Sequence, residues 1–208
     1  MKKITLIGAS GFVGSAILQE AINRNIQVTA LVRQAAKIKI TNPLLKIIEN
    51  DITKKGVIKE AAKDTDAVIS AYNPGWTNPD IYNETLRVYP QILAETKAAK
   101  VNRILIVGGA GTLFVSPGVR VMDTDAIPPE IMGGVKSLGE FYLNTLMNET
   151  EIDWVFFSPA GTFNPEGTRW LFRSISATLF GSNGATHFSL FRSSERSLAK
   201  LIILSVNV

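Results

Sequence analysis

A turn of three glycines, set between a short apolar run and a helical pattern, constrains this chain most. Ile4–Ile7 is apolar enough to form a buried strand, and Gly8, Gly11 and Gly14 follow it with the spacing G-x-x-G-x-x-G. An amphipathic helix is expected over Ser15–Asn23. The first glycine permits a tight turn, the second lets the backbone approach a pyrophosphate, and the third lets the helix pack close to the sheet. The helix N-terminus would present N–H groups to the phosphates.

Apolar runs and helical patterns alternate further along the chain. We expect strands over Gln27–Val32, Leu45–Glu49, Ala67–Ala71, Arg103–Val107 and Trp154–Phe157, and helices over Lys55–Lys63, Ile81–Ala99 and Gly134–Asn148. This alternation predicts βαβ units and an α/β fold with a doubly wound parallel sheet of the Rossmann type. That context favours a dinucleotide-binding turn over a glycine-rich turn that binds nothing. Pro90 should kink the helix that contains it.

Length and composition limit the classes of protein. The 208 residues suit one domain, with 1–165 as the NAD(P)-binding part and 166–208 completing the substrate side without forming an independent domain. There are no cysteines and one histidine, so no metal site is expected. Most of the net charge of +4 lies after residue 165, without a basic stripe, so neither a nucleic acid nor a membrane is expected as a partner. Without a signal or spanning segment, the sequence predicts a cytoplasmic protein.

The end of the second expected strand distinguishes between the two nicotinamide dinucleotides. An acidic residue there would bind the ribose 2′-hydroxyl of NAD, whereas this sequence has Arg33. A guanidinium can pair with a 2′-phosphate and stack on adenine. We therefore expect NADP(H) as the preferred cofactor, with NAD(H) as the alternative if Arg33 is only a surface side chain. Asp51 and Ile52 follow the third strand and would border the adenine, although an exposed turn aspartate fits equally well.

The sequence resembles the atypical and extended short-chain dehydrogenase/reductase superfamily. The resemblance runs from Lys3 to about Pro165, through segments 7–14 (IGASGFVG), 67–71 (AVISA), 103–111 (RILIVGGAG) and 153–161 (DWVFFSPAG). Within the superfamily, the chain is most similar to the NADH-flavin reductase and NmrA-like group, which is related to NAD-dependent epimerases and dehydratases. The resemblance implies NAD(P) binding. Residues 166–208 match the group poorly, so the resemblance does not assign the residues of the substrate pocket.

The residues expected at the cofactor come from the glycine turn, the strand ends and the resemblance. They are Gly8, Ala9, Ser10, Gly11, Phe12, Val13, Gly14, Arg33, Asp51, Ile52, Ala71, Asn73, Gly108, Gly109, Lys136, Ser158, Pro159 and Ala160. Trp76 would lie in a loop beside the nicotinamide, where it could stack on a flat acceptor or simply pack the loop. The segment from Leu113 to Met132 contains three prolines and could cover the substrate as a lid.

Two departures from the superfamily bear on catalysis. Its catalytic members carry a serine after the fifth strand and a Tyr-x-x-x-Lys pair on the next helix. Here Lys136 matches the lysine, Met132 stands at the tyrosine position, and Gly108-Gly109-Ala110 replaces the serine. A thioether cannot donate a proton. No catalytic residue is therefore assigned, although Thr112, Tyr142 or Tyr72 could substitute.

Hydride transfer to a flavin, quinone or similar flat acceptor tolerates these losses, because the acceptor is itself an electron sink and water can supply the proton. We therefore expect an NAD(P)H-dependent oxidoreductase acting on a small molecule. The main alternative is a non-catalytic NADP(H)-binding redox sensor of the NmrA kind, followed by an epimerase or dehydratase. The acceptor and the oligomeric state stay open.

Overall fold

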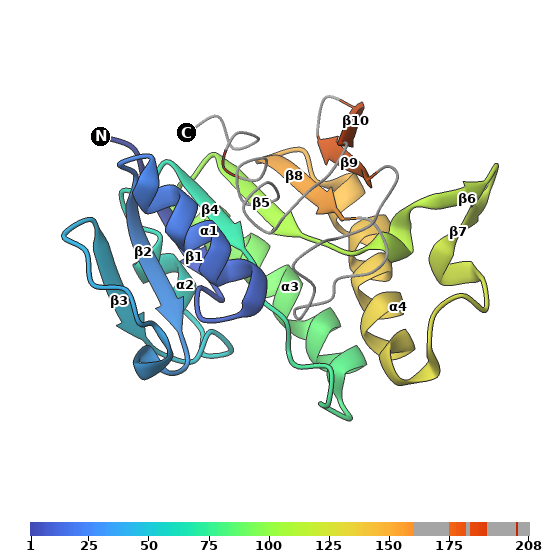
Figure 1. Cartoon of the computed structure of the whole chain (residues 1–208), viewed down its shortest axis with the longest axis horizontal. Helices are drawn as coiled ribbons and strands as arrows, with labels where there is room; N and C mark the ends of the chain where they lie inside the picture. The colour runs from blue at the N-terminus through green and yellow to red at the C-terminus, as the bar shows by residue number, and fades with distance from the viewer. Residues whose placement is uncertain (160–174, 182–183, 191–202, 204–208) are drawn as a thin grey trace.

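The computed structural model describes residues 1–159, 175–181, 184–190 and 203. Its main sheet has the order β10-β9-β8-β5-β4-β1-β2-β3 (Figure 1). Six strands run parallel: β1 Lys3–Ile7, β2 Gln27–Val32, β3 Leu45–Glu49, β4 Ala67–Ser70, β5 Arg103–Val107 and β8 Asp153–Ser158. Two antiparallel strands extend the sheet beyond β8, namely β9 Ile175–Gly181 and β10 Gly184–Leu190. The predicted doubly wound Rossmann-type α/β fold is confirmed.

Helices cover both faces of the parallel sheet. Helix α1 (Phe12–Asn23) packs on one face, whereas α2 (Val57–Ala61), α3 (Ile81–Ala98) and α4 (Pro129–Asn144) pack on the other. Four short 3₁₀ turns, η1 to η4, occupy Ala35–Lys37, Ala110–Thr112, Val121–Asp123 and Leu146–Asn148. A two-stranded hairpin, β6 (Phe114–Ser116) with β7 (Val119–Arg120), projects from the body near α4 (Figure 1).

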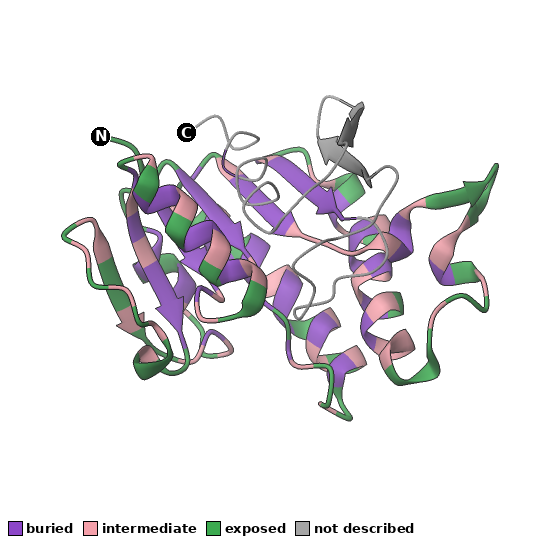
Figure 2. Ribbon diagram, viewed as in Figure 1, coloured by how far each residue is buried: buried purple, intermediate pink, exposed green. Residues whose placement is uncertain are grey.

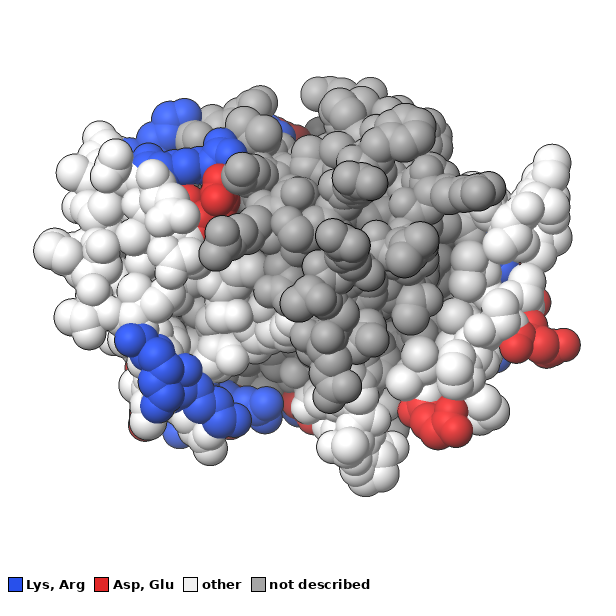
Figure 3. All heavy atoms as spheres, viewed as in Figure 1, with Lys and Arg blue, Asp and Glu red and all other residues white. Residues whose placement is uncertain are grey.

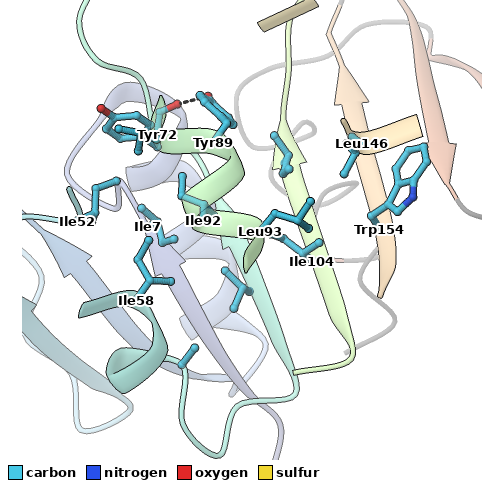
Figure 4. Close-up of a cluster of buried hydrophobic side chains, with 14 of the residues drawn as sticks. Ile7, Ile52, Ile58, Tyr72, Tyr89, Ile92, Leu93, Ile104, Leu146 and Trp154 are labelled. Atoms are coloured by element: carbon cyan, nitrogen blue, oxygen red, sulfur yellow. Dashed lines mark hydrogen bonds between the residues drawn. The ribbon is translucent and has the colours of Figure 1, made fainter. Parts of the chain in front are cut away.

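The central part of the sheet is buried on both faces because alternate residues of β1, β2, β4, β5 and β8 enter two separate hydrophobic clusters. In β1, Ile4 and Leu6 pack against α1, whereas Ile7 faces α2 and α3. Figure 4 shows part of the second cluster, and Figure 2 shows that the central strands are mostly buried whereas the hairpin of β6 and β7 is mostly exposed. This two-sided burial explains why the strands read as continuous apolar runs in the sequence.

A buried carboxylate holds the short helix α2 in place. Glu95 of α3 accepts hydrogen bonds from the backbone N–H groups of Gly56, Ile58 and Lys59 at 2.8, 2.9 and 3.1 Å. These donors belong to the first turn of α2, where no partner exists within the helix. A side chain 36 to 39 residues away therefore caps α2, a contact that local sequence patterns do not reveal.

The helix boundaries differ from the expected ones in three places. Helix α1 begins at Phe12 rather than Ser15, and α2 is shorter than expected. Helix α4 begins at Pro129, because proline is well tolerated in the first turn of a helix. Much of the expected lid segment is therefore hairpin or helix rather than open loop. Helix α3 continues through Pro90 without interruption.

Candidate nucleotide-binding cleft

A cleft of about 1010 Å³ opens at the carboxyl ends of β1, β2, β4 and β5. Ligands of doubly wound sheets bind at this edge. One end of the cleft, called here the α1 end, is lined by the turn between β1 and α1 and by the residues after β2. The other, the α4 end, is lined by the residues after β5 and by one face of α4. Residues after β4 also line the cleft.

The glycine turn at the α1 end has little room for side chains. Gly8 has a φ of +79°, and a Cβ on it would lie 2.6 Å from the carbonyl oxygen of Ala71. A Cβ on Gly14 would lie 2.0 Å from the carbonyl oxygen of Gly8. The N–H of Gly11 donates to that same oxygen at 3.0 Å. These contacts confirm the expected roles of Gly8 in the tight turn and of Gly14 in the close approach of the helix.

The N-terminus of α1 lines the cleft, and its N-cap residue makes no side-chain hydrogen bond to the helix. Gly11 is its N-cap, and the first turn contains no acidic residue. The positive end of the helix dipole is therefore uncompensated by its own first turn, which suits a phosphate. Ser10, Gly11, Phe12 and Val13 line the cleft together with Gly8. Ala9 is buried in the core instead, and Gly14 is buried beneath the turn.

Two cations stand where β2 ends. Arg33 and Lys37 line the cleft, and both are exposed. The η1 turn that carries Lys37 is tied to β3, because the N–H of Ala35 donates to Glu49 Oε2 at 2.5 Å. Figure 3 shows Lys and Arg side chains gathered at this edge of the molecule. Lys37 was missed in the sequence, where nothing marks the short turn that brings it to the cleft.

The two residues expected at the adenine, Asp51 and Ile52, differ in their position relative to the cleft. Ile52 lines the cleft, whereas Asp51 lies outside its lining. The Asp51 carboxylate accepts hydrogen bonds from the N–H and the hydroxyl of Thr53 at 2.9 and 2.8 Å. These bonds hold the pKa of Asp51 below its usual value. Asp51 therefore stabilises the turn after β3, which was the alternative weighed for an exposed aspartate.

The loop after β4 crosses the middle of the cleft. Ala71 and Asn73 line it as expected, and so do Tyr72 and Trp76. The Tyr89 hydroxyl of α3 donates to the carbonyl oxygen of Tyr72 at 2.6 Å (Figure 4). The Tyr72 hydroxyl donates to Glu84 Oε1, also at 2.6 Å. Burial and this bond to Glu84 raise the pKa of Tyr72, so its hydroxyl is a poor proton donor.

Glycines bring the backbone after β5 close to its neighbours at the α4 end. Gly108 and Gly109 line the cleft, as does Pro159 after β8. A Cβ on Gly108 would lie 2.2 Å from the Phe156 ring. Ser158 is fully buried and does not line the cleft, but its hydroxyl lies 2.9 Å from that of Thr112, which does. The prediction for Ala160 lies outside the described residues.

Helix α4 turns an apolar face to the cleft. The lining residues are Ile131, Gly134, Val135, Leu138 and Gly139, which recur at helical spacing on one side of the helix. Met132 and Lys136 are not among them, and Lys136 is exposed. Glu140 accepts a hydrogen bond from the Tyr82 hydroxyl at 2.7 Å. The expected contact of Lys136 with the cofactor does not fit this geometry, because helical periodicity places Lys136 on another face.

The expected lid contributes little to the cleft wall. From the segment 113–132, the lining includes Ile127 and Ile131. The hairpin side chains of Phe114 and Val115 are each 56% exposed. Arg120 stacks on the Phe114 ring, 4.4 Å from its centroid, so the hairpin packs partly on itself.

Across the described ranges, acidic and histidine side chains form no cluster suited to a metal ion. In the same ranges, no helix has the length and hydropathy to cross a membrane.

Comparison with known proteins identifies the family of the chain. Residues 8–187 match the family described as NAD(P)H-binding. The chain belongs to this family. It is 39% identical to the uncharacterized Bacillus subtilis protein YwnB over 169 residues, which cover 80% of this chain and 76% of that protein. The match to the family extends to residue 187, beyond Pro165, where the resemblance recognised in the sequence ends.

Two crystal structures share the fold and a substantial part of the sequence. A candidate epimerase from Bacteroides thetaiotaomicron is 47% identical, with a TM-score of 0.82 over 99% of this chain and 91% of that chain. A candidate NADH-flavin reductase from Streptococcus pneumoniae is 32% identical, with a TM-score of 0.65 over 81% of this chain and 77% of that chain. The cleft therefore belongs to a protein that binds a nicotinamide dinucleotide, as expected.

Proposed function

We propose that this protein is an NADPH-dependent oxidoreductase that reduces a flat acceptor such as a flavin or a quinone. The observation that carries the proposal is the contrast between the two ends of one continuous cleft. The α1 end offers a helix N-terminus with a glycine N-cap and no acidic residue in its first turn, together with two cations, which suits a phosphorylated dinucleotide. The α4 end is apolar, and no described residue of α4 that lines it carries a side-chain proton donor.

The residues present fit a dinucleotide along the cleft. The backbone at Ser10, Gly11 and Phe12 would hold the pyrophosphate, because these residues of the glycine turn line the cleft. Ile52 would contact the adenine. Arg33 and Lys37 would pair with a 2′-phosphate, which makes NADP(H) the preferred cofactor. The bound cofactor supplies a hydride.

The chain itself then has to orient the acceptor and exclude water. Val135 and Leu138 of α4 provide an apolar wall for a planar ring, and Trp76, which is 52% exposed, stands at the cleft margin. A flavin or quinone takes up two electrons as hydride, and solvent provides the remaining proton. No tyrosine is required for that reaction. An epimerase is less well supported, because Tyr72 has a raised pKa and its proton is already bonded to Glu84.

The test measures the oxidation of NADPH and of NADH in the presence of FMN, FAD or menadione. The reaction is monitored by the loss of absorbance of the reduced nicotinamide. We expect faster oxidation with NADPH. Arg33→Ala and Lys37→Ala should each raise the KM for NADPH roughly tenfold and leave that for NADH nearly unchanged. Lys39→Ala is the matched control, because Lys39 is exposed and bonds to the carbonyl of Ala36 instead of lining the cleft.

Two outcomes would replace the proposal. Equal use of NADH and NADPH, unaffected by Arg33→Ala, would remove the 2′-phosphate assignment. Tight NADPH binding in calorimetry without reduction of any acceptor would favour a redox sensor. A sensor must bind the oxidised and reduced cofactor with different affinities, because a ligand shifts an equilibrium only through differential binding.

A further inference from the structure

The hydroxyl groups that line the cleft differ in whether their protons already form a hydrogen bond within the protein. Those of Tyr72, Thr85 and Tyr89 donate to Glu84, to the Ile81 carbonyl and to the Tyr72 carbonyl at 2.6, 2.7 and 2.6 Å. These are short bonds for O–H donors. Ser10 lies in the glycine turn, at the α1 end. Thr112 is the remaining hydroxyl-bearing residue among the described residues of the lining.

Of the two hydroxyl protons of Thr112 and Ser158, one has no good acceptor among the residues that the structure describes. Its hydroxyl and that of Ser158 lie 2.9 Å apart, and either can be the donor. Two hydroxyls carry two protons, and the bond between them uses one. The other printed contact of Thr112 is the Gly109 carbonyl at 3.4 Å, well beyond the usual O–H···O range. Within the described part of the chain, one proton of this buried pair is therefore left over, and an unsatisfied buried donor is costly.

Close packing fixes Thr112 at the α4 end. The η2 turn that carries it approaches α4 so closely that a Cβ on Gly111 would lie 2.4 Å from Val135 Cγ1. On the α4 side, a Cβ on Gly139 would lie 2.3 Å from Met122 Sδ. Thr112 is 3% exposed and has the apolar α4 face beside it. Its hydroxyl is thus a fixed donor in apolar surroundings, where a hydrogen bond is strong.

We propose that Thr112 donates a hydrogen bond to a carbonyl oxygen or ring nitrogen of the acceptor, with Ser158 donating in turn to Thr112. This rests on the proposed reductase function and narrows its substrate class to conjugated rings that carry such an atom. Negative charge develops on that atom as the ring takes up a hydride, and the bond from Thr112 stabilises it. Thr112 transfers no proton, since solvent supplies the one that completes the reduction. Ser158 is a positioning residue that orients the Thr112 hydroxyl.

The experiment compares Thr112→Val, which removes the hydroxyl, with Thr112→Ser, which keeps it. FMN and menadione are the probes, measured by binding to the NADP⁺-loaded protein and by turnover with NADPH. We expect Thr112→Val to weaken FMN binding and to lower kcat/KM for both probes roughly tenfold, with NADPH affinity unchanged. Thr112→Ser should recover most of the loss, and Ser158→Ala should show a smaller loss than Thr112→Val.

Thr124→Val is the matched control, because the Thr124 hydroxyl donates to the Val121 carbonyl away from the cleft. If Thr112→Val fails to fold, Thr112→Ala replaces it in the comparison with Thr112→Ser. Thr112-dependent FMN binding without turnover would support the contact and refute the reductase. Turnover that is unchanged in Thr112→Val, or lost together with NADPH affinity, would overturn the contact alone. If the native protein neither binds nor reduces either probe, both proposals fail.

Discussion

At the α1 end of the cleft, the glycine turn is one continuous segment, residues 8–14, whereas the α4 end combines η2, α4 and Pro159 after β8. The first end works through backbone: the positive φ of Gly8, the missing side chain of Gly14 and the helix N-terminus capped by Gly11. The second works through side chains, with an apolar helix face and one hydroxyl pair. Local sequence therefore describes the α1 end well, whereas distant segments have to meet before the α4 end exists.

The largest effect is expected from a change to the backbone approach at the α1 end. Gly14→Ala would place a Cβ 2.0 Å from the carbonyl oxygen of Gly8, so α1 would have to move away from the turn. We expect the free energy of unfolding to fall by about 3 kcal/mol in urea denaturation. Gly109→Ala is the control, because no atom lies within 4 Å of its Cβ position, and it should change stability by less than about 0.5 kcal/mol. Equal stability of both variants would show that the close approach is dispensable.

A smaller effect is expected at the border of the α1 end. The bonds from Thr53 hold the pKa of Asp51 below its usual value, so the ionised carboxylate stabilises the folded state. That contribution is present above the unfolded pKa of about 3.9 and is lost as the pH falls through the lower folded pKa. Asp51→Asn should therefore lower the thermal midpoint at neutral pH, with a difference from native protein that shrinks below about pH 4. NADPH affinity should not change, and a clear loss of affinity would return Asp51 to the cofactor site.

The smallest effect is expected from the residue that the family resemblance favoured. Lys136→Ala should leave NADPH affinity and turnover within about twofold of the native values, because the exposed side chain lies on a face of α4 away from the cleft. Val135→Ala, one residue earlier on the cleft face, is the informative partner and should alter the KM for the acceptor. A large loss in Lys136→Ala alone would mean that α4 rotates when the cofactor binds.

Prediction from sequence succeeded where the signal was local. The six parallel strands, the positions of Gly8 and Gly14 and the placement of Arg33 at the cleft follow from short apolar runs and the spacing of the turn. For α4 the sequence was less informative: the Tyr-x-x-x-Lys alignment points to Lys136, whereas the neighbouring Val135 is the residue that lines the cleft. A single position on a helix rotates a side chain by about 100°. Because the tyrosine of the Tyr-x-x-x-Lys pattern is absent here, the alignment alone does not determine which face of the helix points toward the cleft.

The amino-acid sequence by itself determined the layered α/β architecture and the dinucleotide turn, because both depend on the chemistry of neighbouring residues. The tertiary structure alone decided which face of α4 meets the cleft, that Lys37 lines the cleft as Arg33 does, and that Thr112 and Ser158 share one bond. Thr112 and Ser158, for example, lie 46 positions apart along the chain. Their geometry depends on how the helices pack on the sheet, and no local pattern in the sequence encodes that packing.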